Sequence, residues 1–551
     1  MPKDSGKKST THQSLSAGNQ SSAEPPSRRN SLEVTASRAF YPIAVIELGT
    51  SSIRMAIGET DGASTVRTLE DLVQGVSLGK DTFTTREIQR GTLQKCVDVL
   101  KSYRRKLEEY HLTNPSHIRV VATSAIREAS NRMAILDRIY SATGFIVEPI
   151  DEAEISRVTY LGIRPMLERQ PELRDAQTML MEVGGGNTEI LFLKGQDIVH
   201  ARSYRLGSLR MQQMTKQYDV GREQAVAMVQ GQIDRTLEEL RDVIPQHGKI
   251  ELLALGGDMR FAAKALKLEP SMSGLLSVPV WDLQRFTDQL SQLSIERIML
   301  NYHLELSEAE TLLPALLANV RMAKMLNVKR MLVTGFNLRD ALLHGVLRPA
   351  DWSDAFRDQI VHSAEEHARK FMVDLDHARH VADLARDIFR YLKSEHQMDD
   401  RHETILNVGA LLHESGLFIT RSGYHKHSYY LIRHSEIFGL DALDHHLVAL
   451  TARYHRRAAP KPSHEAYASL DRNSRVVLSR LAGILRVAIA LAQSRTQRIR
   501  KLKCSLERNR LVLHAKGPSG DLSMEQLELR QQSGLFRDAF GFNVLLRETS
   551  T

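Results

Sequence analysis

The chain has 551 residues, 42% of them hydrophobic and 25% charged, with a formal net charge of +8 and two cysteines. This length predicts three to four globular domains, and so few cysteines exclude a disulfide framework and a thiolate metal site. The chain contains no apolar run of ~20 residues that could span a membrane and no apolar leader at its start, so we expect a cytoplasmic protein without a membrane partner. The basic charge gives weak support to a polyanionic ligand, and nucleic acid is not an expected partner.

The first segment, residues 1–39, is rich in Ser, Thr, Lys, Arg and Pro and shows no apolar periodicity. Such a composition cannot bury enough apolar surface to fold. We therefore expect a disordered basic tail.

A short pattern then occurs twice, at residues 44–57 and again at residues 179–192. In each copy an apolar run ends in an acidic residue, a turn of small residues follows, and a second apolar run begins. Glu47 of the first copy matches Glu182 of the second, and Gly49 matches Gly184. The pattern predicts two buried hairpins, each with a carboxylate close to its tip.

Turns of glycine and small hydroxyl residues leave backbone N–H groups open to an oxyanion, so each turn could bind phosphate. Two such turns facing each other would clamp a phosphate chain, and the adjacent carboxylates could hold Mg²⁺, or alternatively Mn²⁺. In the alternative interpretation the copies are ordinary hairpins whose glycines serve only the turns. The repetition at matching positions favours the phosphate-binding interpretation.

Strands alternate with helices on either side of the second copy, which predicts an α/β sheet in each half. In the first half we expect a helix at 85–110, a strand at 118–122, a helix from Ser124 and a strand at 145–148. In the second half we expect a helix at 222–243, a strand at 251–255 ending in Gly256 and Gly257, a strand at 330–334 ending in Gly335, and a helix at 338–347.

The duplicated turns resemble the phosphate loops of the actin-like ATPase fold, and further segments resemble one family within that superfamily, the Ppx/GppA phosphatases. The similarity covers roughly residues 42–347 and continues toward the C-terminus. The segments that carry it are Val76 to Lys80, Val121 to Arg127, Ile150 to Arg157, Glu182 to Glu189 and Thr334 to Ala341.

The resemblance implies an α/β fold with duplicated actin-like (ribonuclease H-like) domains, followed by an all-α HD-like domain and a small α/β subdomain. The expected boundaries are 40–177, 178–347, 348–500 and 501–551. It also implies a homodimer that releases terminal orthophosphate from inorganic polyphosphate or guanosine pentaphosphate. Two alternatives stay open: a weak or inactive member that binds polyphosphate or (p)ppGpp, and another actin-like activity such as a kinase.

The same resemblance implies roles for individual residues. Glu154, from a Glu-Glu-Ala-Arg stretch of the family, would orient or deprotonate the attacking water. Glu47 and Glu182 would hold the metal ion. The expected phosphate-binding residues are Gly49, Thr50, Ser51, Ser52, Arg54, Arg127, Gly184, Gly185, Gly186, Asn187 and Thr188.

Several positions depart from the family pattern. Both loop acids are glutamate where the family has aspartate, which moves each carboxylate outward by one methylene, and misplacement by ~1 Å can cost ~100-fold in rate. Ser51 replaces an asparagine, Ser124 replaces a catalytic glutamate, and Ile155 follows Glu154. Glu154 has a purely structural alternative, because acids are favoured in the first turn of any helix.

From about residue 352 the chain is predicted to be helical and rich in histidine, and it resembles an HD-type phosphohydrolase domain. His413-Glu414 stands for the His-Asp pair, and Ala488 to Ala492 lacks the later aspartate. We expect no metal here and instead a basic path for anions, with a plain helical scaffold as the alternative. The residues expected to form this path are Lys426, Arg433, Arg453, His455, Arg456 and Arg457.

Overall fold

The computed structural model describes residues 40–61, 66–218, 220–241, 244, 248–271, 274–346, 352–456, 458–499, 501–516 and 522–548. The N-terminal tail and Arg457 lie outside the described residues. The chain from Phe40 to Thr551 forms one compact unit.

The first sheet has the strand order β3-β2-β1-β4-β5, in which β1 pairs antiparallel with β2 and parallel with β4. Its strands are β1 (Tyr41–Leu48), β2 (Ser52–Thr60), β3 (Val66–Gly75), β4 (Ile118–Ala122) and β5 (Val147–Pro149). The helices that follow these strands along the chain are α1 (Leu78–Thr85), α2 (Arg90–Glu109), α3 (Ser124–Arg127), α4 (Arg132–Thr143), α5 (Glu152–Arg169) and α6 (Pro171–Arg174).

The second sheet has the order β10-β11-β9-β6-β7-β8, so β8-β7-β6-β9-β11 repeats the strand order of the first sheet. This repetition confirms the predicted duplication. Its strands are β6 (Gln177–Val183), β7 (Thr188–Lys194), β8 (Asp197–Tyr204), β9 (Ile250–Leu255), β10 (Leu276–Pro279) and β11 (Arg330–Val333). Its helices are α7 (Ser208–Gln217), α8 (Arg222–Arg241), α9 (Gly257–Ala265), α10 (Val280–Ser291), α11 (Ile295–Tyr302) and α12 (Leu306–Met325).

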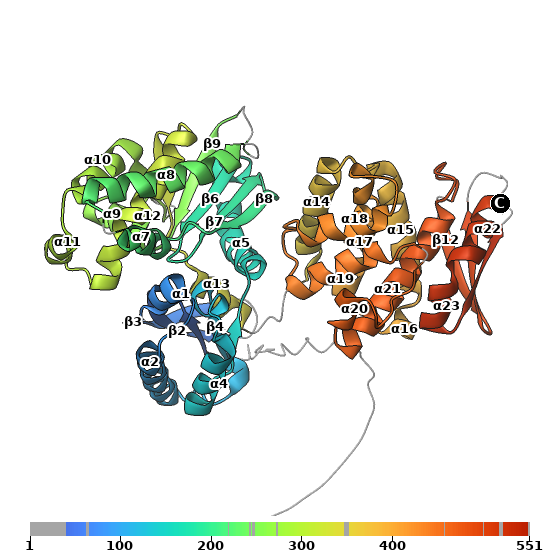
Figure 1. Ribbon diagram of the computed structural model, residues 1–551, viewed down its shortest axis with the longest axis horizontal. Coiled ribbons are helices and arrows are strands. Elements are labelled where there is room, and N and C mark those ends of the chain that lie inside the picture. Colours follow the sequence, from blue (N-terminus) through green and yellow to red (C-terminus); the bar gives the residue numbers. More distant parts are fainter. Residues whose placement is uncertain are drawn as a thin grey trace, which may run out of the picture. The chain divides into compact units, whose positions relative to one another are not determined.

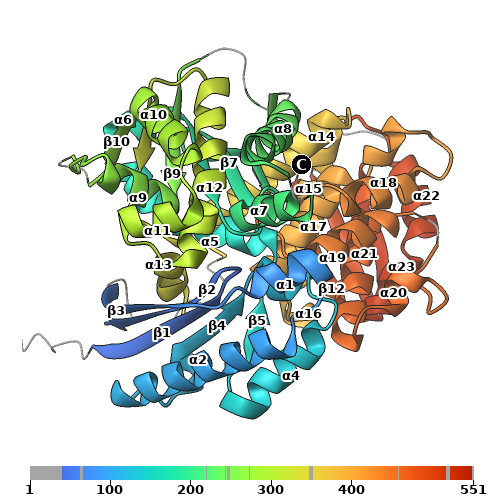
Figure 2. The same ribbon diagram turned by 60° about the vertical axis from the view of Figure 1, so that its left-hand side comes forward.

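Both faces of each sheet are buried. Alternate side chains of a strand point to opposite faces, so neighbouring residues of one strand pack in different cores. In β1, Ala44 and Ile46 pack in one core with residues of α2 and α4, whereas Ile43 and Val45 pack with α5 and with α13 (Leu338–Gly345). Figure 2 shows α2 and α4 together beside the first sheet. Although α13 follows the second sheet in the chain, it packs on the first.

The edge strands β3 and β8 and the helix α12 were not predicted. Charged and polar residues interrupt β3, and seven of its ten residues are exposed, so its apolar alternation is weak. In contrast, the predicted strands at 118–122 and 251–255 lie within one residue of β4 and β9.

The remainder forms a helical domain and a small three-stranded subdomain, which confirms the predicted fold class (Figure 1). The helices are α14 (Asp354–Lys370), α15 (Leu375–Tyr391), α16 (Lys393–His396), α17 (Asp400–Leu412), α18 (Tyr424–Arg433), α19 (Ala442–Arg453), α20 (Glu465–Ala468) and α21 (Arg472–Leu491). The subdomain comprises β12 (Lys501–Glu507), β13 (Arg510–Lys516), α22 (Ser523–Gln532), α23 (Gly534–Phe540) and β14 (Asn543–Glu548). Among the described residues, no helix combines the length and apolar character needed to cross a membrane.

Candidate active site

The two repeated turns have the same backbone hydrogen bond. The N–H of Gly49 donates to the Ser52 carbonyl at 3.0 Å, and the N–H of Gly184 donates to the Asn187 carbonyl at 2.8 Å. The predicted hairpins are confirmed, but these two N–H groups are used within the turns and cannot bind a ligand. The next N–H groups in each turn, at residues 50–51 and 185–186, have no acceptor among the described residues.

The two turns contact each other directly. A Cβ atom placed on Gly185 would lie 2.0 Å from Thr50 Oγ1, and one on Gly186 would lie 2.1 Å from Ser124 Oγ. Such distances are far below van der Waals contact, so only glycine fits at these two positions. The approach brings the free N–H groups of both turns to one place.

Both turns line a cavity of about 900 Å³ between the two sheets. The first half contributes Arg54, Lys80 and Arg127 to its wall, and the second half contributes Asp258 and Arg260. The predicted site residues that line it are Glu47, Gly49, Thr50, Ser51, Ser52, Arg54, Arg127, Glu182, Gly184, Gly185, Gly186 and Asn187. Gly256 and Gly257 also line it, as do Leu304 to Glu308 and Glu310 to Leu312 around the start of α12.

Thr188 and Glu154 are predicted site residues that are not among the residues lining the cavity. Thr188 is fully buried in β7, where its hydroxyl donates to the Leu206 carbonyl at 2.6 Å. It therefore stabilises the hairpin rather than facing a ligand. Gly335 is likewise absent from the lining residues.

Glu154 is held by two arginines. Arg157 donates to both carboxylate oxygens, from Nε at 2.6 Å and from Nη2 at 2.7 Å, and Arg119 donates at 3.3 Å. Burial acts to raise the pKa of Glu154, but the two guanidinium groups outweigh it and lower the pKa. These contacts favour a structural role for Glu154, and the geometry does not support its predicted role as the base.

The next residue, Ile155, lines the cavity instead. Successive residues of an α-helix point about 100° apart, so Glu154 and Ile155 cannot face the same space. Ser124 also lines the cavity and is 5% exposed. Thus the residues that face the cavity from these two segments carry no carboxylate.

The Glu47 carboxylate is paired within the protein. Arg339 Nη1 donates to Glu47 Oε2 at 3.0 Å, while Arg339 Nη2 reaches Asp71 at 3.3 Å. The side chains of Arg339 and Glu47 are 7% and 12% exposed, whereas that of Asp71 is 46% exposed. A cation bound at Glu47 would have to share this carboxylate with Arg339.

Glu182 lies opposite Glu189 in the pairing of β6 with β7. Burial raises the pKa of Glu182, and the nearby charge of Glu47 raises it further. Burial also raises the pKa of Glu189 to about 8, although Ser203 donates a hydrogen bond to it at 2.7 Å. The second oxygen of Glu189, Oε2, is buried without a partner among the described residues. One buried and one half-buried carboxylate fit a hard divalent cation such as Mg²⁺.

Sequence reasoning named Glu182 but missed Glu189 and Asp258 as site residues. Burial raises the pKa of Asp258 to about 7, and the charges of Arg54 and Arg260 act to lower it. The signals were present: Glu189 is opposite Glu182 once the hairpin register is drawn, and Asp258 follows two glycines at the end of a strand. Acids at such sites commonly have shifted pKa values.

Arg127 lines the cavity but already has partners, since it donates to the Ile150 carbonyl at 2.8 Å and pairs with Glu152.

In the helical domain, charges of Lys426, Arg456 and Arg453 act on His425. This group includes three residues of the predicted basic path. His455, by contrast, is 3% exposed.

Comparisons with known proteins agree with the resemblance seen in the sequence. Residues 57–349 match the Ppx/GppA phosphatase family, and residues 361–532 match domain III of Ppx/GppA phosphatases. A guanosine-5'-triphosphate,3'-diphosphate pyrophosphatase of Photobacterium profundum is 22% identical over 518 residues, which cover 92% of this chain and 98% of that protein. A protein of the same name from Pseudoalteromonas atlantica is 22% identical, covering 82% and 86%.

Solved structures with a similar chain path include the following two. The Aquifex aeolicus member of the Ppx/GppA family has a TM-score of 0.46 and 21% identity, covering 57% of this chain and 100% of that one. An exopolyphosphatase from Cytophaga hutchinsonii has a TM-score of 0.47 and 22% identity, covering 56% and 97%.

Proposed function

Because this chain belongs to the Ppx/GppA phosphatase family, we propose that its cleft binds the terminal phosphates of guanosine pentaphosphate or inorganic polyphosphate and slowly releases orthophosphate. The observation that carries the proposal is the contact between the two glycine turns, whose free N–H groups line one cavity with Glu182. Backbone N–H groups fixed in place stabilise phosphoryl charge without having to reorganise during the reaction.

Each half of the cleft has its own role in this proposal. The turn N–H groups bind the terminal phosphoryl oxygens, while Arg54 and Lys80 neutralise the neighbouring phosphates. Glu182 and Glu189 hold Mg²⁺, or alternatively Mn²⁺, and Glu47 joins them where Arg339 gives way. The bound cation would neutralise charge on the phosphate oxygens.

Turnover is expected to be slow because Ser124 replaces one of the two family glutamates, and the other, Glu154, is held by Arg157 and Arg119 away from the cavity. Ser124 and Ile155 face the cavity instead, and neither has useful basicity near neutral pH. The same observation favours a second candidate function, in which the protein binds these ligands without hydrolysing them and acts as a regulatory protein.

We infer a preference for guanosine pentaphosphate over a long polyphosphate. Acidic residues at the start of α12 line its second half, namely Glu305, Glu308 and Glu310, together with Asp258. Glu310 is paired with Lys216, but the other three would disfavour a polyanion that extended past the terminal phosphates. Guanine, in contrast, carries an N2 amino group that can donate a hydrogen bond to a carboxylate. The names of the two bacterial relatives agree with this preference.

The test measures binding and phosphate release separately, with guanosine pentaphosphate and with long-chain polyphosphate, each in Mg²⁺ and in Mn²⁺. We expect salt-sensitive binding, a low rate of release, and a higher rate with Mn²⁺, which tolerates the displaced glutamate carboxylates better. Binding without release under all conditions would establish the second candidate function. If neither ligand binds even at low ionic strength, both functions are wrong.

A further inference from the structure

Three side chains that could bind a metal ion converge in the helical domain, outside the cleft. They are His377, in the first turn of α15, and His413 and Glu414, which follow α17. The nitrogen and oxygen atoms that they offer all lie within 4.8 Å of one another. All three residues are buried, with exposures of 7%, 1% and 8%.

The hydrogen bonds leave lone pairs of this cluster unused. The Nδ1 atom of His413 lies 2.6 Å from the Ala410 carbonyl, which can only accept, so Nδ1 carries the proton and Nε2 is left with its lone pair. The Nδ1 atom of His377 is buried without a partner among the described residues. Histidines that bind metal typically donate their other ring N–H to a carbonyl in this way, which fixes the tautomer.

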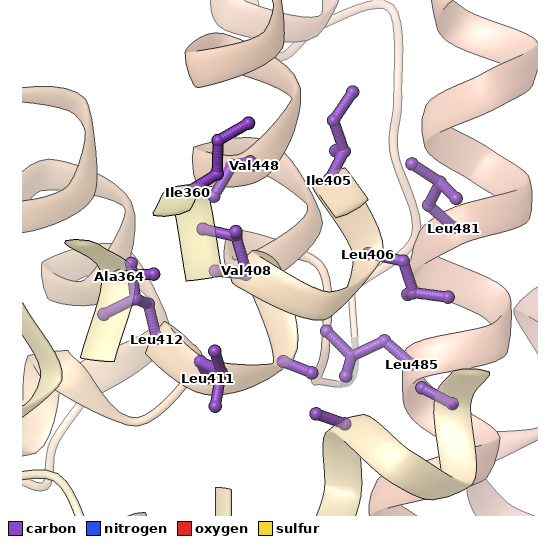
Figure 3. Close-up of a cluster of buried hydrophobic side chains, with 14 of the residues drawn as sticks. Ile360, Ala364, Ile405, Leu406, Val408, Leu411, Leu412, Val448, Leu481 and Leu485 are labelled. Atoms are coloured by element: carbon purple, nitrogen blue, oxygen red, sulfur yellow. The ribbon is translucent and has the colours of Figure 1, made fainter. Parts of the chain in front are cut away.

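The backbone beneath the cluster is fixed by the main core of the domain. Figure 3 shows Leu411 and Leu412, the last residues of α17, among the side chains of that core, together with Leu406 and Leu485. His413 follows this anchored turn directly. The ligand atoms are therefore held on a rigid element, as a preorganised site requires.

We propose that His377, His413 and Glu414 bind one divalent transition-metal ion of the Zn²⁺ type. Two imidazoles and one carboxylate are a donor set of zinc sites that keep a position open for water or substrate. The sequence led to the opposite expectation because Ala488 to Ala492 lack an aspartate, and the structure places those alanines in the buried part of α21 and just after it. Without the aspartate the site has one ligand fewer, but the other three still converge.

The neighbouring charged and aromatic groups limit the site to these three ligands. His455 has its ring centre 5.1 Å from that of His413, but both of its nitrogens have partners, the Ala452 carbonyl and the Tyr424 hydroxyl. It is therefore not a fourth ligand.

Arg495 opposes metal binding. Its guanidinium pairs with Glu414 and also lies 3.5 Å from Asp374. Because Arg495 is half exposed and has this second acidic partner, it can release Glu414 to a metal ion. We expect the metal ion to bind against this competition, so that removing the positive charge strengthens binding.

The test uses the full chain, stripped with a chelator and titrated with Co²⁺ in excess Mg²⁺, which prefers the oxygen ligands of the cleft. We expect one Co²⁺ per chain, displaced by Zn²⁺, with the visible absorption of four-coordinate cobalt. His377→Gln should weaken Co²⁺ binding by about 100-fold or more, comparable to or larger than losses of supporting groups at metal sites. Arg495→Gln should strengthen it several-fold.

His380→Gln is the matched control, since His380 lies one turn further along α15 and also has a buried ring nitrogen without a described partner. It should bind Co²⁺ as the unaltered chain does. The proposal is overturned if less than stoichiometric Co²⁺ binds, or if His377→Gln and His380→Gln bind it equally. Should His377→Gln fail to fold, unchanged affinity in Arg495→Gln would overturn it independently.

Discussion

The two halves of the cleft have the same backbone but opposite electrostatic character. Strand order, hairpin register and the turn hydrogen bond are repeated in both. However, Glu47 lies opposite Arg54 in its hairpin and is paired with Arg339, whereas Glu182 lies opposite Glu189. The acid of the first half is thus paired directly with an arginine, whereas Glu189 of the second half keeps one carboxylate oxygen, Oε2, without a partner among the described residues.

This difference indicates a division of labour. A turn that binds phosphate through backbone N–H groups depends on its conformation, so both copies keep their glycines. Side chains are free to diverge around that turn. In the proposed function, Arg54 and Lys80 of the first half would face a phosphate chain, while Glu182 and Glu189 of the second half would hold a cation; all four line the cavity.

The largest expected effect comes from breaking the second half. Glu182→Gln should lower metal-dependent phosphate release on the order of 100-fold, because the cation loses a carboxylate ligand, while the free energy of unfolding is unchanged or higher. Glu47→Gln should show the opposite pattern, with little loss of phosphate release. It should lower the free energy of unfolding by about 3 kcal/mol, because it leaves the buried Arg339 with only Asp71. Phosphate-release assays and urea unfolding of both variants measure these effects. Equal losses of stability in the two variants would remove the distinction between the halves.

The duplication itself could be predicted from sequence because each hairpin is local. Its two strands and turn lie within residues 41–60 in the first copy and 177–194 in the second, and apolar runs, an acid and glycines are visible directly. The α/β alternation and most strand positions followed from the same patterns. Some edge strands and helices escaped, and for the polar strand β3 the reason is its weak apolar alternation.

The partners of the acids could not be predicted in the same way. Arg339 lies 292 residues from Glu47 in the chain, and no local pattern joins them. The side of α5 that faces the cleft was also undetermined, because the choice between Glu154 and Ile155 depends on how the helix is rotated against the sheet. The family motif alone pointed to the retained glutamate, which the structure places against two arginines.

A smaller effect is expected from restoring an acid to the first half. Ile155→Glu would place a carboxylate in the cavity and should raise the rate of phosphate release on the order of 10-fold or more, toward the range of a positioned base. Ile155→Gln is the matched control and should not raise it. Glu154→Gln should leave the rate of the unaltered chain nearly unchanged, and a large loss there would restore Glu154 as the base. Ser124→Glu is less informative, because Ser124 packs against Gly186.

The last expected effect is a pH dependence of stability that belongs to the second half. Burial raises the pKa of Glu189 from 4.5 to about 8, so between these values the folded protein holds a proton that the unfolded chain releases. The free energy of unfolding should therefore fall as pH rises through this window, by at most about 1.4 kcal/mol per pH unit for one group, and level off above it. Glu189→Gln should flatten the decline between pH 4.5 and 8, and Asp258→Asn should flatten its lower part, since the pKa of Asp258 is raised from 3.8 to about 7. Urea unfolding at a series of pH values, without divalent cations, measures both. Profiles that run parallel to that of the unaltered chain would show that these carboxyl groups are not protonated in the folded protein.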